Sequence, residues 1–477
     1  MLFSSLIFLF AFLPVVFILY FTVCRNNMAA KNTLLLLASL FFYAWGEPKF
    51  VLVMLLSIAV NYIAGMIVHK KRTGGGNAKV WLVLAVIFNL LILFIFKYLN
   101  FAISNIDRIF GDIIPQTNIV LPIGISFFTF QAMSYVVDVY RGTVRVQKNP
   151  FYVALYISFF PQLIAGPIVR YSTIEKQIKE RYVTFDDFSE GVRRFLIGLS
   201  KKVILANNFA VIADQAFATS DGGNLSVAFA WLGSIAYTLQ IFFDFSAYSD
   251  MAIGLGRMFG FHFLENFDYP YISRSVSEFW RRWHISLGVW FRDYVYIPLG
   301  GSRVKNKALL VRNLFVVWSL TGVWHGANWT FIFWGLGYFI LITAEKLFDI
   351  PGRFKNSFAK IAYGAFTFLC VNTGWVLFRA DSISQAGNYL KAMIGLNGNG
   401  LLDNLATQYF CENWIFFIVG ILYSVRLFKY MRERIEDNRK LVGKIEWLGM
   451  FVYLSLFVLS VSYLVMGAYN PFIYFNF

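Results

Sequence analysis

Two histidines are the residues of this chain best suited to acid-base chemistry. The chain has four histidines, and two of them, His284 and His325, fall in tryptophan-rich stretches of a largely apolar sequence. The ordinary pKa of imidazole suits proton transfer near neutral pH. An ionisable group at membrane depth needs a cavity or a partner and is by default a candidate for function. The pair therefore predicts acid-base chemistry inside a membrane.

Polar neighbours surround His325 at helical spacing. Thr321 and Asn328 flank it in the stretch SLTGVWHGANWTFIFWG, and either side chain could hold the imidazole in one tautomer. The alternative is a histidine that only packs between helices with its hydrogen bonds satisfied.

Aromatic and basic residues directly precede His284. Residues 280–283 have the sequence Trp-Arg-Arg-Trp, and helical spacing predicts that Trp280, Arg281 and Gly288 share a face with His284. Such a cluster suits an anionic, partly apolar ligand on the cytoplasmic side, such as an acyl thioester carrier. Because Trp and Arg both favour the membrane boundary, interfacial anchoring is the alternative.

Four polar residues share one face of the apolar segment 226–249. Tyr237, Gln240, Asp244 and Tyr248 are spaced three, four and four residues apart, as on one side of a helix. A polar face within a membrane span should point at protein rather than lipid. It predicts either a ladder of interhelical hydrogen bonds or the wall of a polar cavity that contains the histidines.

Other chemistries fit the sequence less well. No G-x-S-x-G motif provides a serine nucleophile. A metal site would need His262, Glu265, His284 and His325 to converge without the compact spacing of metal-binding motifs. The three cysteines are far apart and form no metal-spaced group. We therefore expect no bound metal or cofactor.

Composition predicts an all-α, polytopic membrane protein. Hydrophobic residues make up 58% of the chain and charged residues only 14%, against about 25% charged in soluble proteins. With roughly 20 residues needed per crossing, the apolar stretches predict about ten to twelve transmembrane helices. Residues 151–169, broken by Gly and Pro, are expected to be re-entrant. Residues 185–199 are expected to form a membrane-surface helix that leads into a span.

Charge is distributed by loop rather than gathered in one patch. The net charge is +16, but basic residues concentrate in alternate loops, such as 70–79, whereas 99–118 and 380–412 carry almost none. This positive-inside pattern places both termini on the extracytoplasmic side of the cell membrane and makes nucleic-acid binding unnecessary. Without a linker or repeat, residues 1–477 are expected to form one integral-membrane domain.

Several long segments, in order along the chain, resemble membrane-bound O-acyltransferases, and most closely the bacterial alginate O-acetyltransferase subgroup. The likeness covers nearly the whole chain. It is carried by PIGISFFTFQAMSYVVDVYRG (122–142), FFPQLIAGPIVRY (159–171), QIFFDFSAYSDMAIGLGRMFGF (240–261), residues 266–303 and GVWHGANWTFIFWG (322–335).

The resemblance implies roles for both histidines. His325 matches the histidine treated as catalytic in the superfamily, and His284 matches a second active-site histidine. Such proteins form a funnel that brings a cytoplasmic acyl donor, here acetyl-CoA or another acyl thioester, to an extracytoplasmic acceptor. Acyl transfer also needs oxyanion stabilisation, for which Asn328 and the indole N–H of Trp324 or Trp329 are candidates. An extracellular or cell-wall polysaccharide is the expected acceptor, with an SGNH-type acetyltransferase or esterase as the expected partner.

Three other functions remain open from the sequence. The first is D-alanyl transfer to teichoic acid, whose membrane component has the same general pattern. The second is a transporter or polymer-export channel, with the polar face of 226–249 as its conduction path. The third is a non-catalytic scaffold.

The chain ends FIYFNF, with Tyr474 between two phenylalanines. This spacing resembles the F-x-Y-x-x-F terminus of a small partner peptide in the D-alanyl system, in which the tyrosine receives the acyl group and relays it. A phenol forms an activated ester, because the pKa of the leaving group is about 10. The alternative is aromatic packing of a terminal segment at the membrane interface.

Overall fold

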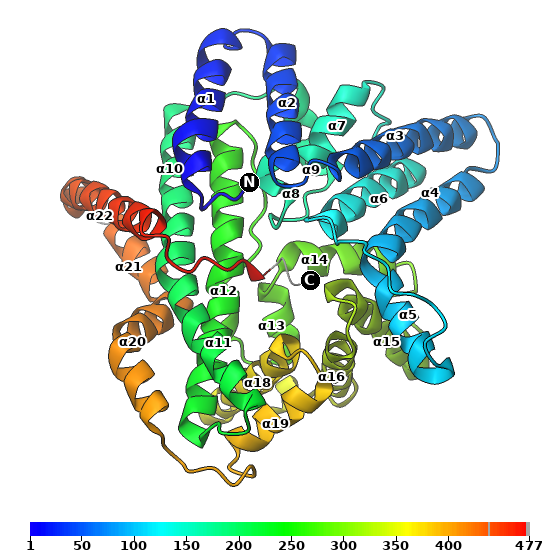
Figure 1. Ribbon diagram of the computed structural model, residues 1–477. Coiled ribbons are helices and arrows are strands. Elements are labelled where there is room, and N and C mark those ends of the chain that lie inside the picture. Colours follow the sequence, from blue (N-terminus) through cyan, green and yellow to red (C-terminus); the bar gives the residue numbers. More distant parts are fainter. Residues whose placement is uncertain (437–438, 474–477) are drawn as a thin grey trace. The chain divides into compact units, whose positions relative to one another are not determined.

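The protein is all-helical. The computed structural model describes residues 1–436 and 439–473. These residues form helices and connecting loops, and none of them lies in a β-strand. Ten of the helices built from them are long and apolar enough to cross a membrane (Figure 1). The predicted all-α, multi-pass architecture is confirmed, and the number of long apolar helices lies within the expected range.

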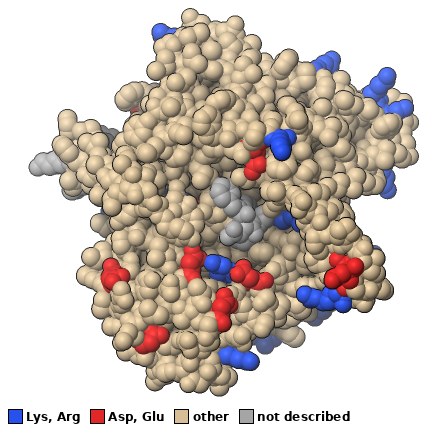
Figure 2. Space-filling view, in the orientation of Figure 1, with Lys and Arg blue, Asp and Glu red and all other residues tan. Residues whose placement is uncertain are grey.

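The surface is apolar to an extent that soluble proteins do not show. Most of the face drawn in Figure 2 carries neither basic nor acidic side chains. Large apolar side chains are exposed along the long helices, for example Leu454 and Val458 on α22 (Arg439–Val465). Soluble monomers rarely expose such continuous apolar areas, so these side chains face lipid.

Contacts between residues divide the chain into two compact units. The first comprises Met1–Phe195 and Tyr248–Leu264, and the second comprises Leu196–Ala247 and Glu265–Phe477. Both histidines singled out from the sequence belong to the second unit. The expectation of one integral domain stays a prediction.

Close helix packing characterises the first unit, in which α3, α4 and α6 contact one another and lie side by side (Figure 1). Gly65 on α3 permits this approach, because a Cβ atom there would lie 2.9 Å from the Tyr135 ring on α6. The helices are α1 (Leu13–Ile18), α2 (Met28–Gly46), α3 (Val51–Thr73), α4 (Ala78–Leu93), α5 (Leu99–Phe110), α6 (Ile125–Arg141), α7 (Pro150–Ser158), α8 (Phe160–Leu163), α9 (Tyr171–Lys179) and α10 (Phe185–Ser200), with π-helical turns at Phe8–Phe12, Leu19–Val23 and Phe94–Tyr98.

The segment that was expected not to span consists of two short helices. α7 has nine residues and α8 has four, and Phe159 between them is extended. Neither approaches the roughly 20 residues that a crossing needs. The broken backbone is hydrogen-bonded within the protein, since the N–H of Phe160 donates to the hydroxyl of Ser39 at 3.0 Å. The predicted break in this segment is confirmed.

The helix predicted at 185–199 continues without a break. α10 passes through the π-helical turn η4 (Lys201–Ala206) into α11 (Asn207–Asp221). The whole stretch counts among the ten long apolar helices. The sequence located the amphipathic start of this helix correctly.

Long helices of the second unit surround the short helices that carry His284. This unit contains η4 and α11, and α12 (Val227–Met258) supplies residues up to Ala247 to it. The other helices are α13 (Val276–Arg282), α14 (Ile285–Phe291), α15 (Lys307–His325), α16 (Trp329–Phe348), α17 (Ile350–Arg353), α18 (Ser357–Arg379), α19 (Ile383–Met393), α20 (Asn404–Ser424), α21 (Leu427–Glu436) and α22, with a 3₁₀ turn at Pro270–Ile272 and a π-helical turn at Arg292–Tyr296.

The backbones of α15 and α16 approach each other at two glycines. A Cβ atom on Gly335 would lie 2.5 Å from the carbonyl oxygen of Trp318 and 3.0 Å from the Cα atom of Gly322. Small residues allow such close approach between membrane helices. The contact fixes the last turn of α15, which ends at His325.

Candidate active site

His284 lies at a sharp break between two short helices. α13 ends at Arg282 and α14 begins at Ile285. Between them His284 has a left-handed φ of 46°, a conformation that costs a non-glycine residue on the order of 1–3 kcal/mol and clusters at functional sites. The prediction that Trp280, Arg281 and Gly288 share one helix face with His284 is wrong, because Trp280 and Arg281 lie on α13 whereas Gly288 lies on α14.

The side chain of Asn266 orients His284. The Oδ1 atom of Asn266 lies 3.3 Å from Nδ1 of His284 and accepts hydrogen bonds from the backbone N–H and the hydroxyl of Ser286, at 3.1 and 2.9 Å. Because a backbone N–H can only donate, this Asn266 atom is the carbonyl oxygen, and Nδ1 of His284 donates to it. The lone pair of the neutral imidazole is therefore on Nε2.

Burial also controls the charge of His284. The residue is 1% exposed, and desolvation lowers the pKa of His284 to about 3. The imidazole is consequently neutral at pH 7, and its Nε2 atom can accept a hydrogen bond.

His325 is the last residue of α15 and is buried among aromatic rings. Its imidazole makes edge-on contacts with Trp334 on α16, at 4.9 Å between ring centroids, and with Phe378 on α18, at 5.2 Å. Aromatic walls exclude water and hold the ring in place. The close contact of α15 with α16 thus determines where this imidazole lies.

One indole ring contacts both histidines. The Trp324 ring lies 4.9 Å from the imidazole of His325 and 6.0 Å from that of His284, measured between centroids. The residues, 41 positions apart in the sequence, therefore belong to one site. That the two histidines act together stays a prediction.

A pocket opens beside His325. Its lining is mostly apolar, and His325 and Asp244 are its ionisable members. Phe245, which also lines the pocket, has its ring 4.6 Å from the imidazole of His284. The full lining consists of Ile241, Asp244, Phe245, Trp283, His325, Trp375, Phe378, Phe472 and Ile473.

The polar face of α12 contributes one residue to this lining. Asp244 faces the pocket, whereas Gln240 and Tyr237 are buried nearer the start of the helix. The Oε1 atom of Gln240 has no hydrogen-bond partner among the described residues. Tyr248 belongs to the first unit.

The residues expected at a donor entrance have different environments. The Trp280 ring is packed edge-on against Trp318 and Tyr338, at 5.0 and 4.9 Å between centroids. Arg281 is exposed. Trp280 is half-buried, and the charged side chain of Arg281 is accessible for an anionic ligand in solution.

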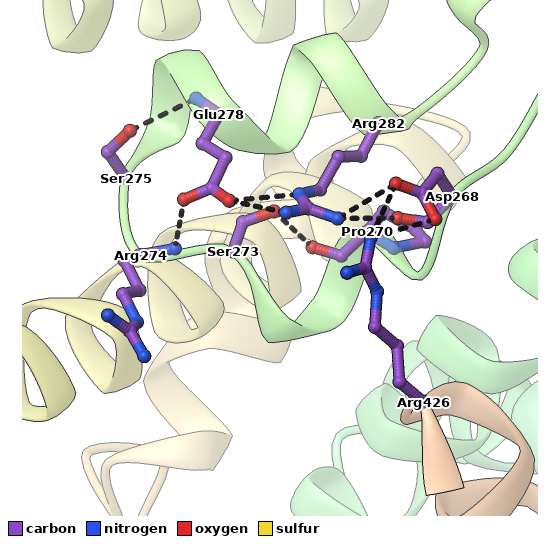
Figure 3. Close-up of polar contacts among 8 residues, drawn as sticks. All are labelled: Asp268, Pro270, Ser273, Arg274, Ser275, Glu278, Arg282 and Arg426. Atoms are coloured by element: carbon purple, nitrogen blue, oxygen red, sulfur yellow. Dashed lines mark hydrogen bonds and ion pairs between the residues drawn. The ribbon is translucent and has the colours of Figure 1, made fainter. Parts of the chain in front are cut away.

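Arg282 belongs to an ion-pair network that braces α13 (Figure 3). Its guanidinium lies between Glu278, at 2.8 Å, and Asp268, at 3.0 Å, and Arg426 also reaches Asp268, at 2.8 Å. Figure 3 shows the guanidinium of Arg274 turned away from these carboxylates. Arg282 therefore serves the structure of the segment rather than a ligand.

The polar residues that flank His325 in sequence stabilise helices. The hydroxyl of Thr321 donates to the carbonyl of Val317 at 2.7 Å. The side chain of Asn328 caps α16 by accepting from the N–H of Thr330 at 3.1 Å, and donates to the carbonyl of Asp381 at 2.9 Å. Both polar atoms of the Asn328 amide are thus already hydrogen-bonded.

Of the two tryptophans considered as oxyanion donors, Trp324 is buried and contacts His325. Trp329 is 42% exposed.

Two residues of the site were not recognised from the sequence. Asn266 lies in a loop with no periodic pattern, and its role depends on the turn at His284. Lys202 forms an ion pair with Asp244 at 2.7 Å. A lysine at the start of the apolar run KVILANNFA was a usable signal, because a charge within a membrane segment needs a partner.

No metal-binding group is present within the described ranges, where no three His, Cys, Asp or Glu side chains are placed to hold an ion. Tyr474 lies outside the described residues. Ile473, the residue before it, lines the pocket with His325.

Residues 127–372 match the membrane-bound O-acyltransferase family, and the chain belongs to this family. Both His284 and His325 fall within the matched residues.

Three named proteins show which members of this family the chain resembles. The chain is 40% identical to a probable alginate O-acetylase AlgI of Pseudomonas putida, with complete coverage of both proteins. It is 36% identical to a peptidoglycan O-acetyltransferase of Helicobacter pylori, over 100% of this chain and 98% of that protein. A teichoic acid D-alanyltransferase of Bacillus subtilis is 32% identical, but only over 49% of this chain and 61% of that protein.

Proposed function

We propose that this protein transfers acetyl groups from a cytoplasmic thioester, such as acetyl-CoA, for O-acetylation of an extracellular or cell-wall polysaccharide. The observation that carries the proposal is the buried pocket in which His325 and Asp244 face the same space. Trp324 contacts both His325 and His284 beside it. The names of the full-length relatives support acetyl as the acyl group and a glycan as the acceptor.

His325 acts as the general base in this proposal. Its imidazole takes the proton of the attacking hydroxyl, whose oxygen bonds to the thioester carbonyl carbon. The tetrahedral oxyanion then collapses, the carbon–sulfur bond breaks, and the proton passes from the imidazolium to the departing thiolate. An N–H donor near the carbonyl stabilises the oxyanion, and the buried indole of Trp324 is the donor that we assign.

His284 and its neighbours bind the acyl donor in this proposal. With its lone pair on Nε2, His284 accepts a hydrogen bond from the donor or from an intervening water. Exposed Arg281 binds the anionic carrier, beside the packed ring of Trp280, while Gln240 and Asp244 supply polar groups on α12. The positive-inside charge pattern supports a cytoplasmic donor and extracytoplasmic termini in the cell membrane.

Tyr474 relays the acetyl group in two transfers. The phenol first attacks the thioester with His325 as base, giving a phenolic ester. A hydroxyl of the acceptor glycan, or of an extracytoplasmic SGNH-type partner, then attacks this ester and regenerates the phenol. The relay is supported by the terminal sequence FIYFNF and by the position of Ile473 in the lining of the pocket.

Substitution of His325 tests the reaction. In cells, His325→Ala and His325→Gln should each lower the acetyl ester content of the glycan by about 10²–10⁴-fold, because a positioned base is lost. Ester content is measured as acetate released by mild alkali, with protein level determined by immunoblot. The matched control is His69→Ala, on α3 of the other unit.

Full ester content in His325→Gln would indicate a channel or transporter and would refute the assignment of the base. Release of D-alanine in place of acetate would establish the D-alanyl alternative.

Substitution of Tyr474 tests the relay separately. Tyr474→Phe keeps the ring and removes only the hydroxyl, so the relay predicts loss of glycan acetylation at an unchanged protein level. Mass spectrometry should also detect an acetyl adduct on the C-terminal peptide of the wild-type protein. Full activity of Tyr474→Phe would leave only aromatic packing as the role of this residue.

A further inference from the structure

A buried ion pair lies at the edge of the pocket. Lys202 on η4 and Asp244 on α12 are 3% and 2% exposed, and their Nζ and Oδ1 atoms are 2.7 Å apart. Taking both charges out of water is costly, so a buried pair needs further hydrogen bonds on its remaining donors and acceptors. The proposed reaction uses Asp244 as a polar group on the donor side and does not use Lys202.

The C-terminal segment, residues 470–473, supplies these hydrogen bonds from its main chain. The ammonium of Lys202 donates to the carbonyl oxygen of Pro471. The N–H of Ile473 donates to Oδ2 of Asp244 at 3.0 Å. Each member of the ion pair thus bonds one main-chain group of the C-terminal segment.

Side chains add to this attachment. The Nδ2 atom of Asn207 donates to Oδ1 of Asn470 at 3.2 Å, and the ammonium of Lys202 lies 5.8 Å from the centroid of the Phe472 ring. One residue earlier, the hydroxyl of Tyr469 donates to Asp214 at 2.8 Å. Phe472 and Ile473 are 6% and 9% exposed, which is unusual for the end of a chain.

The arrangement fixes both the direction and the register of the segment. A carbonyl at 471 must face the cation, and an N–H at 473 must face the carboxylate. A shift by one residue would break both bonds, because it moves the carbonyl of residue 471 away from Lys202 and the N–H of residue 473 away from Asp244. The positive charge of Lys202 and the negative charge of Asp244 therefore hold residues 470–473 in one position beside His325.

We propose that Lys202 and Asp244 are positioning residues that hold the C-terminal segment in the pocket beside His325. We call this placement of residues 470–473 the seating of the segment. Its consequence for catalysis rests on the proposed function, in which Tyr474, the residue after Ile473, carries the acyl group. The seating itself is independent of that function and is tested without an activity measurement.

Labelling of a cysteine at position 473 measures the seating. The parent carries Ile473→Cys in a chain whose native cysteines Cys24, Cys370 and Cys411 are replaced by alanine, and the rate of its reaction with a water-soluble maleimide is measured on purified protein. The test variant adds Lys202→Met and Asp244→Leu together. Replacing a buried ion pair by apolar residues of similar size is often neutral or stabilising, so the double variant is expected to fold.

The double variant should react with the maleimide about tenfold faster or more, because the segment loses both main-chain partners and opens more often. The matched control replaces a second ion pair of the chain, Arg194 with Asp250 at 2.9 Å, by Arg194→Met and Asp250→Leu. This control should keep the rate of the parent. Thermal unfolding of all the variants verifies that they are folded.

An unchanged labelling rate in the folded double variant would overturn the proposal, and so would an equal increase in the control. His325→Ala in the same parent separates this proposal from the proposed function. It should lose acetyl transfer while position 473 stays protected. If His325→Ala retained acetyl transfer, the assignment of His325 as the base would be wrong. The labelling rates would still decide whether Lys202 and Asp244 hold the C-terminal segment in place.

Discussion

His284 and His325 are held in place by different means. Asn266 and the left-handed turn orient His284, whereas aromatic rings and the end of α15 orient His325. Their importance could be predicted from the sequence, because a histidine in an apolar segment is costly without a function. Asn266 could not be predicted, since its contact with His284 depends on a backbone turn that no spacing rule indicates.

The buried state of His284 predicts how stability depends on pH. Its pKa is about 3 in the folded protein and about 6.5 when unfolded. Below pH 6.5 the unfolded chain binds a proton that the folded protein does not. The contribution of neutral His284 to the free energy of unfolding is therefore complete above pH 6.5. It is lost as the pH falls toward 3, by up to about 1.4 kcal/mol per pH unit.

Chemical unfolding in detergent at pH 7.5 and pH 5.0 measures this effect. Between these two pH values, the free energy of unfolding should fall more for the wild-type protein than for His284→Gln, because glutamine does not titrate. Parallel falls in the two proteins would show that His284 is not the group responsible. His69→Gln, on α3, is the control, and its free energy of unfolding should fall as much as that of the wild-type protein.

At the scale of elements, α13 shows how a seven-residue helix is made stable. Isolated helices of this length do not persist in water. Glu345 on α16 accepts hydrogen bonds from the N–H groups of Val276 and Ser277, at 2.7 and 2.8 Å. The hydroxyl of Ser275 accepts from the N–H of Glu278 at 3.0 Å, so the first three N–H groups of the helix are all bonded.

Part of this arrangement could be read from the sequence. The S-x-x-E pattern of Ser275 and Glu278 is typical of a helix start. Glu345 could not be assigned, because it lies almost 70 residues away and meets α13 only in the tertiary structure. Sequence spacing likewise predicted a helical region around His284 but not the break that divides it.

Glu345→Gln should destabilise the protein. The carboxylate accepts hydrogen bonds at a helix N-terminus, where negative charge is favourable, and loss of hydrogen bonds to a charged group costs about 1.5–3 kcal/mol. The free energy of unfolding, measured by chemical denaturation in detergent, should fall by this amount. Glu412→Gln, at an exposed position on α20, is the matched control. Equal stability of the two variants would contradict the role of Glu345.

At the scale of the whole molecule, composition alone predicted the architecture. A chain with few charges and many apolar stretches of membrane-spanning length can satisfy its backbone in lipid only as helices or a closed barrel. The ten long apolar helices of the described residues agree with that expectation. The pairing of Lys202 with Asp244 was not predicted, because it joins segments that helical periodicity treats separately.

The positive-inside pattern predicts which loops face the cytoplasm. In intact cells, a membrane-impermeant maleimide should label Leu402→Cys, at an exposed position in the loop before α20, when it is the only cysteine. Lys79→Cys, in a chain without other cysteines, should be labelled only after the cytoplasmic membrane is permeabilised. The reverse pattern would contradict the predicted orientation of the termini.

Acetyl transfer by purified protein tests the central claim most directly. The wild-type protein, His325→Ala and His69→Ala are each reconstituted into vesicles and given labelled acetyl-CoA on the side that carries the basic loops, with the glycan on the other. We expect labelled glycan with the wild-type protein and the His69 variant, and a rate lower by about 10²–10⁴-fold with His325→Ala. A wild-type rate for His325→Ala would contradict the claim that this buried imidazole is the base of the acyl transfer.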